Sequence, residues 1–321
     1  MLPNPGKTLL LFWGLLLFFI PMLCSEYRIV AFSDNVSLYT DCKLKADYSA
    51  MLSALDQHID DLQMSTGIYL DKRAEIYIVP DRSSYQQLAL GKESIVEFSD
   101  AFYSSAEGRI YIRNAIYVQD NYFKILLHEY MHWFLDEVFS GAPLWFHEGM
   151  ATRFANQLGY ERYLYFMRER FWGNDMNLFK MSYHYPEAQQ DWQMYYLHSY
   201  FAVKFMQERD EKAWNRFWGI AADAHRKGYK TQFTPAFNHA FDLSLFDFQA
   251  LYSKHSKRLA YQYLFIAVNS VVFTIFPFIL VFAALRRKRK MRAMPDLPEI
   301  VDDVEEVEDE DERDDDERDE R

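Results

Sequence analysis

Residues 128–132 read H-E-Y-M-H and hold the side chains of this chain that are best suited to metal chemistry. On an α-helix, residues four positions apart lie on the same face, so His128 and His132 can direct two imidazoles at one Zn²⁺ ion. Glu129 lies beside them and can reach a water that the metal activates. A catalytic zinc ion usually takes three protein ligands and keeps the fourth position for water. The pattern therefore predicts a hydrolytic zinc site with a further ligand downstream.

Two arrangements of the third ligand fit the sequence poorly. A metzincin needs glycine and histidine where this chain has Leu135 and Val138, which excludes that class. Asp136 follows His132 by one helical turn, but ligands on three successive turns of one helix lie along a line. Because a zinc site is tetrahedral, we disfavour Asp136.

Glu148 is the candidate that we prefer for the third position. It lies beyond the sequence S-G-A-P at residues 140–143, which ends the first helix, and near the start of a new helical stretch. A second helix can therefore fold back and present this carboxylate to the metal. His147 is an alternative ligand or a partner of one, although neighbouring residues on a helix point about 100° apart. Thr152 could orient a metal-bound histidine, or lie on the helix without such a role.

The segment 143–151 reads P-L-W-F-H-E-G-M-A. Together with the H-E-x-x-H motif, it resembles the paired motifs of the gluzincin metallopeptidases, and among them the small peptidase MA-like domains. The resemblance implies His128, His132 and Glu148 as zinc ligands and Glu129 as the general base.

A looser likeness to the same family covers residues 196–203, Y-L-H-S-Y-F-A-V. By that likeness Tyr196 donates a hydrogen bond to the tetrahedral intermediate. The alternative is that Tyr196 is a packed aromatic, since the chain holds 23 tyrosines. The resemblance covers roughly residues 74–250 and implies a sheet that packs against the helix with the H-E-x-x-H motif.

Hydrophobic spacing predicts an α+β domain in which strands come first and a helical subdomain follows. Strands are expected over residues 27–32, 74–79 and 108–113, and helices over 47–64, 82–90, 120–138, 158–172, 193–208, 211–224 and 243–258. Asp47 is the expected cap of the first helix. If residues 110–112 form the edge strand of the cleft, an extended peptide can add to that edge by backbone hydrogen bonds. Together with the resemblance, this order implies an α+β fold: a small zincin-like domain with a mixed sheet packed on the H-E-x-x-H helix, followed by a helical subdomain.

Both ends of the chain carry apolar segments that are separate from the domain over residues 26–258. Residues 1–25 are expected to be a signal peptide or an uncleaved signal anchor. Residues 259–285 hold no charged side chain and exceed the roughly 20 residues that a membrane span needs. The basic run R-R-K-R-K follows at 286–290, which predicts a cytoplasmic C-terminus and an extracytoplasmic domain. An uncleaved N-terminal segment would make two spans.

The composition is half hydrophobic and 18% aromatic, which supplies a buried core. The acidic residues gather after Met294, so that segment accounts for the net charge of −12 and is expected to be a disordered tail. No pattern indicates nucleic-acid binding.

The sequence predicts a membrane-anchored zinc peptidase. Its expected partners are a peptide or protein substrate and, through residues 259–285, membrane lipid. The alternative is an envelope protein that keeps the zincin-like fold but acts as a binding or assembly module. An intramembrane protease is disfavoured, since Asp120, Lys124, Asp136 and Glu137 lie too close to the motif for it to sit in a span.

Overall fold

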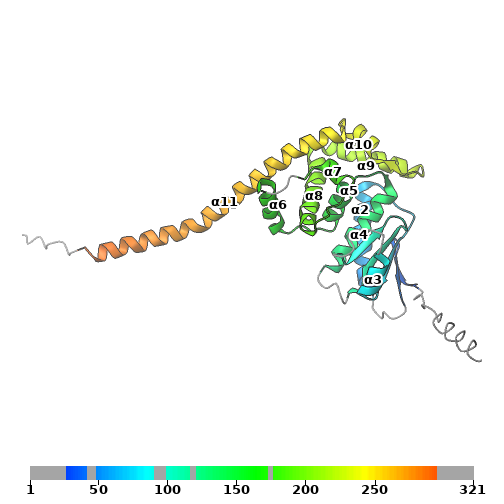
Figure 1. The fold of residues 1–321 in the computed structure, drawn as a ribbon, viewed down its shortest axis with the longest axis horizontal. Coiled ribbons are helices and arrows are strands. Elements are labelled where there is room, and N and C mark those ends of the chain that lie inside the picture. The colour runs from blue at the N-terminus through cyan, green and yellow to red at the C-terminus, as the bar shows by residue number, and fades with distance from the viewer. Residues whose placement is uncertain (1–26, 42–47, 90–98, 116–120, 173–175, 295–321) are drawn as a thin grey trace, which may run out of the picture. The chain divides into compact units, whose positions relative to one another are not determined.

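The structure is a computed structural model that describes residues 27–41, 48–89, 99–115, 121–172 and 176–294 (Figure 1). The strands are β1 (Arg28–Phe32), β2 (Val36–Thr40), β3 (Ala74–Val79), β4 (Ala101–Ser104), β5 (Arg109–Arg113), β6 (Phe139–Ser140) and β7 (Thr231–Gln232). The helices are α2 (Ser49–Thr66), α3 (Arg82–Ala89), α4 (Tyr122–Val138), α5 (Leu144–Phe154), α6 (Tyr160–Trp172), α7 (Leu178–Met181), α8 (Trp192–Arg209), α9 (Glu211–Arg226), α10 (Phe233–Phe241) and α11 (Leu245–Arg292), with a short 3₁₀ turn over Gln189–Asp191. The expected mixture of strands and helices is confirmed.

Five strands form one mixed sheet in the order β1-β2-β3-β5-β4. The inner pairs β2–β3 and β3–β5 are parallel, whereas β1 and β4 pair antiparallel with their neighbours. The expectation that residues 110–112 form an edge strand is wrong, because β5 lies between β3 and β4. The edge belongs to β4, a strand of four residues that is too short to show a period-two pattern in the sequence.

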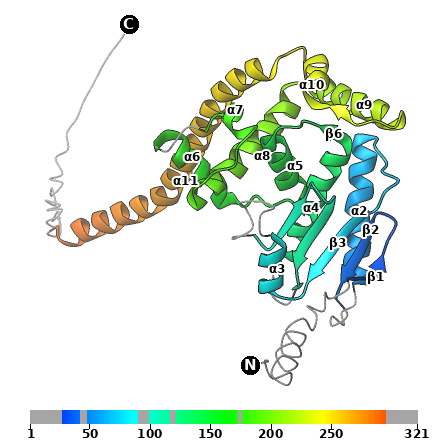
Figure 2. The same ribbon diagram turned by 45° about the vertical axis from the view of Figure 1, so that its right-hand side comes forward.

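The two faces of the sheet bury different side chains. Aliphatic residues such as Ile76 and Ile110 point into the main core, which α2 and α4 also enter. On the other face the rings of Tyr39 and Tyr77 stack with centroids 4.6 Å apart, and Tyr111 follows Tyr77 at 5.3 Å. α3 covers this second cluster (Figure 2). The alternation follows from the period of a strand, in which successive side chains face opposite sides.

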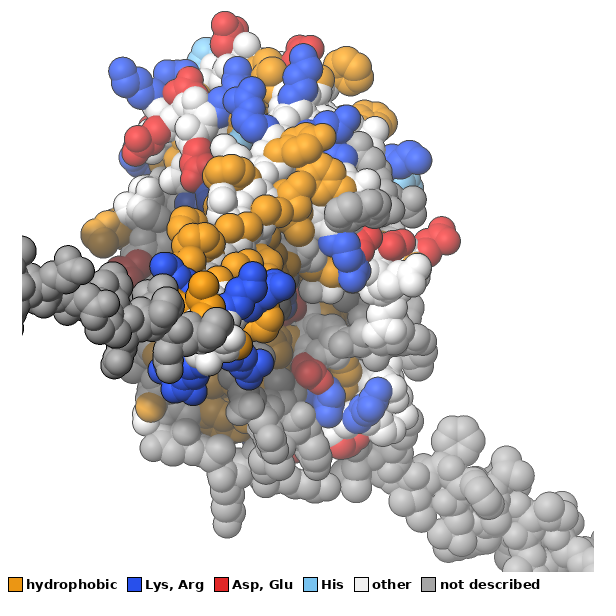
Figure 3. Space-filling view, turned by 90° about the vertical axis from the view of Figure 1, so that its left-hand side faces the viewer, with side chains coloured by type: hydrophobic (Ala, Val, Ile, Leu, Met, Phe, Trp, Pro, Cys, Tyr) orange, Lys and Arg blue, Asp and Glu red, His pale blue; other side chains and the backbone are white. Residues whose placement is uncertain are grey.

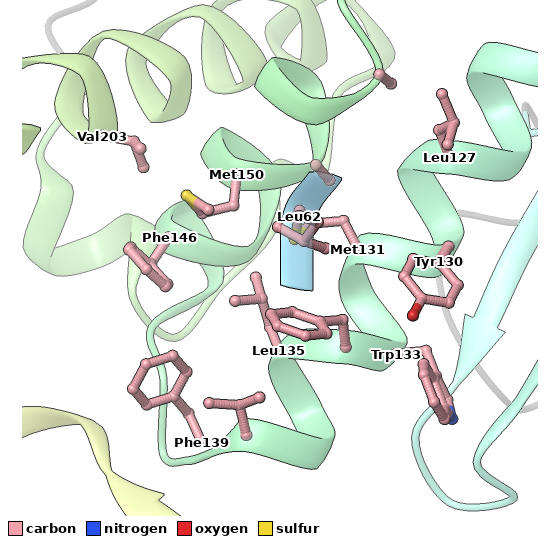
Figure 4. Close-up of a cluster of buried hydrophobic side chains, with 14 of the residues drawn as sticks. Leu62, Leu127, Tyr130, Met131, Trp133, Leu135, Phe139, Phe146, Met150 and Val203 are labelled. Atoms are coloured by element: carbon pink, nitrogen blue, oxygen red, sulfur yellow. The ribbon is translucent and has the colours of Figure 1, made fainter. Parts of the chain in front are cut away.

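Helix α4 crosses the interior of the domain, and its extent agrees with the prediction. Figure 4 shows Met131 and Leu135 of α4 among buried side chains that include Phe146 and Met150 of α5. Burial of large apolar side chains contributes roughly 1.5–3 kcal/mol each. Packing on several sides therefore fixes the rotation of α4, and with it the direction of any polar side chain that it carries.

The turn between α4 and α5 depends on one glycine. Gly141 adopts φ +68°, in the left-handed region that an L side chain rarely enters. Pro143 follows as the N-cap residue of α5, and its carbonyl accepts a hydrogen bond from the Phe146 amide. The expected helix break at 140–143 is thus confirmed, and it lets α5 return along α4.

Helix α11 joins two segments that were expected to be separate. The helix predicted over 243–258 and the uncharged segment 259–285 form one continuous helix with Pro277 inside it. It is long and apolar enough to cross a membrane, and large side chains along it such as Phe273 and Phe278 are exposed. Hydrophobic side chains gather on the face of the molecule that Figure 3 shows. The compact unit that contains the sheet extends to Phe265. The expected signal segment, the Asp47 cap and the acidic tail lie outside the described residues.

Candidate metal centre

The two histidines of the H-E-x-x-H motif lie on one face of α4, as their spacing predicts. The ring centroids of His128 and His132 are 4.8 Å apart. Neighbouring residues of α4 on its other faces are buried in the core, so both imidazoles are held against the α5 side.

Glu148 reaches the same place from α5. Its Oε2 atom lies 3.3 Å from His128 Nε2 and 3.7 Å from His132 Nε2. The three donor atoms lie within 4.8 Å of one another. In a tetrahedral site with ligand bonds of about 2.1 Å, donor atoms are about 3.4 Å apart. The spacing between the carboxylate and both imidazoles therefore suits a single cation.

Gly149 explains why α5 can bring its carboxylate so close. A Cβ atom at this position would lie 2.3 Å from the Ser199 carbonyl oxygen and 2.6 Å from a Val203 methyl carbon, both on α8. Only glycine permits this approach of α5 to α8. The glycine of the W-F-x-E-G sequence is thus a packing residue that positions the neighbouring Glu148.

Burial and charge act against each other in this cluster. Burial alone would raise the pKa of Glu148, but His132 and His128 hold it below its usual value, so the carboxylate is ionised. Burial lowers the pKa of His132 to about 3. Burial also opposes protonation of His128, but the Glu148 carboxylate outweighs it and raises that pKa. A buried anion between two imidazoles is the charge pattern of a cation site.

Two residues that sequence reasoning missed complete the surroundings of the ligands. The Tyr185 hydroxyl donates a hydrogen bond to Glu148 Oε1 over 3.1 Å, and it orients the carboxylate. Gln157, just beyond α5, also raises the pKa of His128. Neither residue lies at helical spacing from the motifs. Tyr185 is one of 23 tyrosines, so nothing in the sequence distinguishes it.

Glu129 and Tyr196 line the same cavity as the three candidate ligands. This cavity has a volume of about 250 Å³. The ring of Tyr196, on α8, lies 6.1 Å from the His128 ring. Burial, followed by the charges of Glu148 and Glu129, raises the Tyr196 pKa well above its usual value, so its hydroxyl keeps its proton. Tyr196 and Glu129 thus line one cavity together with the candidate ligands.

The alternative ligands lie near the cluster but outside it. The Asp136 carboxylate accepts a hydrogen bond from the Tyr103 hydroxyl at 2.7 Å. The His147 ring stacks on His132 with centroids 5.8 Å apart. Among the described residues, the group that can hold a metal consists of His128, His132 and Glu148. Thr152 is buried, and its hydroxyl makes no hydrogen bond to any described residue, so an orienting role for it is not shown.

The residues present fit a metal ion by their chemistry. Glu148 Oε2 is buried and has no well-aligned hydrogen bond to a described residue. Such an atom is costly to bury unless a cation or a donor satisfies it. Two imidazoles and one carboxylate are also a donor set that catalytic zinc accepts. The site can therefore hold a metal ion through His128, His132 and Glu148.

A larger cavity of about 980 Å³ lies between β1 and α2. Asp56, Asp60 and Asp61 line it, but its described lining includes no histidine or cysteine. Size alone does not make it the better site, because chemistry needs converging functional groups.

Comparison with protein-family models gives no match to this chain. Comparison with curated proteins gives no significantly similar relative.

Proposed function

We propose that this chain is a membrane-anchored zinc peptidase of the gluzincin type. The observation that carries the proposal is the convergence of His128, His132 and Glu148, with Glu129 and Tyr196 in the same cavity. A bound Zn²⁺ ion supplies a Lewis acid that polarises a carbonyl and lowers the pKa of water.

The remaining roles belong to side chains of the chain. Glu129 lies next to a ligand in sequence and lines the cavity, so it accepts the proton of the attacking water and passes it to the leaving amine. Tyr196 keeps its proton and donates a hydrogen bond to the developing oxyanion. Tyr185 holds the Glu148 carboxylate in place.

Strand β4 is the proposed edge strand to which the peptide substrate binds. Ala101, Phe102 and Tyr103 of β4 line the cavity that contains Glu129. β4 ends the described sheet, since its partner within the sheet is β5 on one side. An extended peptide can pair with such an edge through backbone hydrogen bonds, which selects backbone shape over side-chain identity.

The anchor in this proposal is the uncharged segment 259–285 of α11. Its length and composition suit a membrane span, and the basic residues 286–290 favour a cytoplasmic C-terminus. The domain with the candidate metal centre is then extracytoplasmic.

The test compares full-length wild-type protein with Glu129→Gln, using metal analysis and cleavage of a peptide library. We expect the variant to keep its metal and to lose most peptide cleavage, by about 100-fold or more. Glu137→Gln is the control, because Glu137 lies on the same helix and pairs with Lys72. Equal cleavage by Glu129→Gln and wild type would remove Glu129 from the reaction. A metal-loaded wild type that cleaves no peptide would favour the non-catalytic alternative.

A further inference from the structure

Helix α6 packs against the part of α11 where its uncharged segment begins. The Tyr163 ring lies 5.1 Å from the Tyr263 ring, and the Phe171 ring lies 4.8 Å from the Tyr261 ring. The Arg170 guanidinium donates a hydrogen bond to the Ser256 hydroxyl at 3.2 Å. Figure 2 shows α6 beside this stretch of α11. These contacts join the folded domain to the proposed anchor.

The contacts leave no spacer between the domain and the apolar segment. The uncharged segment starts at Leu259, yet Ala260 is fully buried in the domain core and Tyr263 packs against it. Residues 264–285 then provide the roughly 20 residues that a span needs. The folded domain therefore continues directly into the apolar segment of the chain.

The exposed side chains next to these contacts match a membrane interface. Tyr261 and Phe265 are 61% and 70% exposed, and Leu164 of α6 is also exposed. Aromatic side chains are enriched at the level of lipid headgroups. Lys257 and Lys254 lie about one and two turns before Tyr261 on α11, and both are exposed.

We propose that α6 and residues 254–265 of α11 form an interfacial collar that lies on a bilayer with anionic phospholipids. Leu164, Tyr261 and Phe265 enter the headgroup zone, and the lysine side chains bind lipid phosphates. Lipid is the occupant because the patch continues into the chain's own apolar segment and carries positive charge. The collar rests on the membrane anchor proposed above.

The experiment measures the depth of single sites in the full-length protein. Cys24 and Cys42 are replaced by serine, and a fluorescent probe is attached at Leu164→Cys in nanodiscs of zwitterionic and anionic phospholipids. We expect lipids with a quencher near the headgroup to remove about half or more of the probe fluorescence, as for a group at headgroup depth. The same probe at Met64→Cys, an exposed position on α2, is the control and should keep its fluorescence.

A third probe at Phe273→Cys separates the collar from the anchor. Quenching of Phe273→Cys by lipids with a deep quencher, without quenching at Leu164→Cys, would overturn the collar and leave the span intact. Absence of quenching at both positions would overturn both proposals.

Two double variants with equal changes of charge test whether Lys254 and Lys257 contribute to lipid binding. Lys254→Glu/Lys257→Glu should weaken the quenching at Leu164→Cys, whereas Lys212→Glu/Lys227→Glu changes the charge equally at exposed positions of α9 and beyond it and should leave the quenching unchanged. Equal quenching in both double variants would contradict lipid binding by these lysines.

Discussion

Two groups of buried histidines lie in this domain and differ in their partners. His128 and His132 surround the Glu148 carboxylate. His198 on α8 is more fully buried than either of them, and its Nδ1 atom contacts the Tyr252 hydroxyl at 3.0 Å, while that hydroxyl donates to the His198 carbonyl oxygen. Burial, and then the charge of Arg170, lowers the pKa of His198 to about 3.

The difference shows what separates a candidate metal-binding histidine from a histidine of the core. His198 is neutral, and its Nδ1 atom is held by a tyrosine within the core, so it fixes the position of α11 against α8. The pair on α4 faces an ionised carboxylate instead. Burial is common to both groups, whereas a converging anion is present in one of them. Substitutions in and around the two groups test that distinction.

The largest effect is expected from Glu148→Ala. Removing the anion leaves two imidazoles, which hold a divalent ion far less firmly, so we expect zinc affinity to fall by about 100-fold or more. His198→Asn should leave zinc affinity unchanged. Competition with a chromogenic chelator measures both variants. Full zinc occupancy in Glu148→Ala would return the third position to Asp136 or His147.

Gly149→Ala tests the packing of α5, which carries Glu148, against α8, which carries His198. The added methyl meets the α8 backbone at Ser199, next to His198, so α5 must move away. Overpacking of this kind costs about 1–3 kcal/mol, and we expect the midpoint of denaturant unfolding to fall accordingly. Gly219→Ala is the control, because nothing lies within 4 Å of its Cβ position. Equal midpoints for the two variants would contradict the close approach of α5 and α8.

The pH dependence of stability tests whether His198 is neutral in the folded protein. Its pKa is about 3 in the folded protein and near 6.5 in the unfolded chain, so between these values the unfolded chain binds a proton that the folded domain does not. Stability is therefore full above pH 6.5 and is lost as the pH falls toward 3, by about 1.4 kcal/mol per unit. In unfolding measurements with the metal removed, the free energy of unfolding of His198→Gln should therefore fall less steeply with decreasing pH than that of the wild type. An unchanged slope would show that His198 titrates in the folded state.

The smallest effect concerns Tyr185→Phe. The variant loses the hydrogen bond to Glu148 Oε1 but keeps the ring that stacks on Trp192. Partners of metal ligands typically contribute 10–100-fold to affinity, and we expect about tenfold weaker zinc binding with unchanged stability. Tyr183→Phe, at an exposed tyrosine nearby in sequence, is the control. Equal affinity in Tyr185→Phe would remove this tyrosine from the support of Glu148.

The parts of the fold that the sequence predicts are those with a repeating pattern. α4 and β3 have the expected bounds because helical or alternating apolar residues run through their whole length. β2 and β4 were missed, and the misplaced edge of the sheet follows from missing β4, which has four residues.

The candidate site likewise has residues that the sequence predicts and residues that it does not. His128 and His132 are local on one helix, and Glu148 follows a turn that Gly141 signals. Tyr185 was not predictable, because its contact with Glu148 depends on how the segment before α8 folds over α5. His198 also looks like a ligand by residue type, and only its tyrosine partner shows that it is structural.

The most direct test of the central claim is X-ray absorption spectroscopy of the full-length protein loaded with one equivalent of zinc. We predict a first coordination shell of nitrogen and oxygen at about 2.0–2.2 Å, with the multiple scattering of two imidazoles. In His198→Asn the spectrum should be unchanged, and in His132→Ala the signal of one imidazole should disappear. A wild-type spectrum with fewer than two imidazoles, or one that His132→Ala does not alter, would contradict the claim that these residues hold the metal.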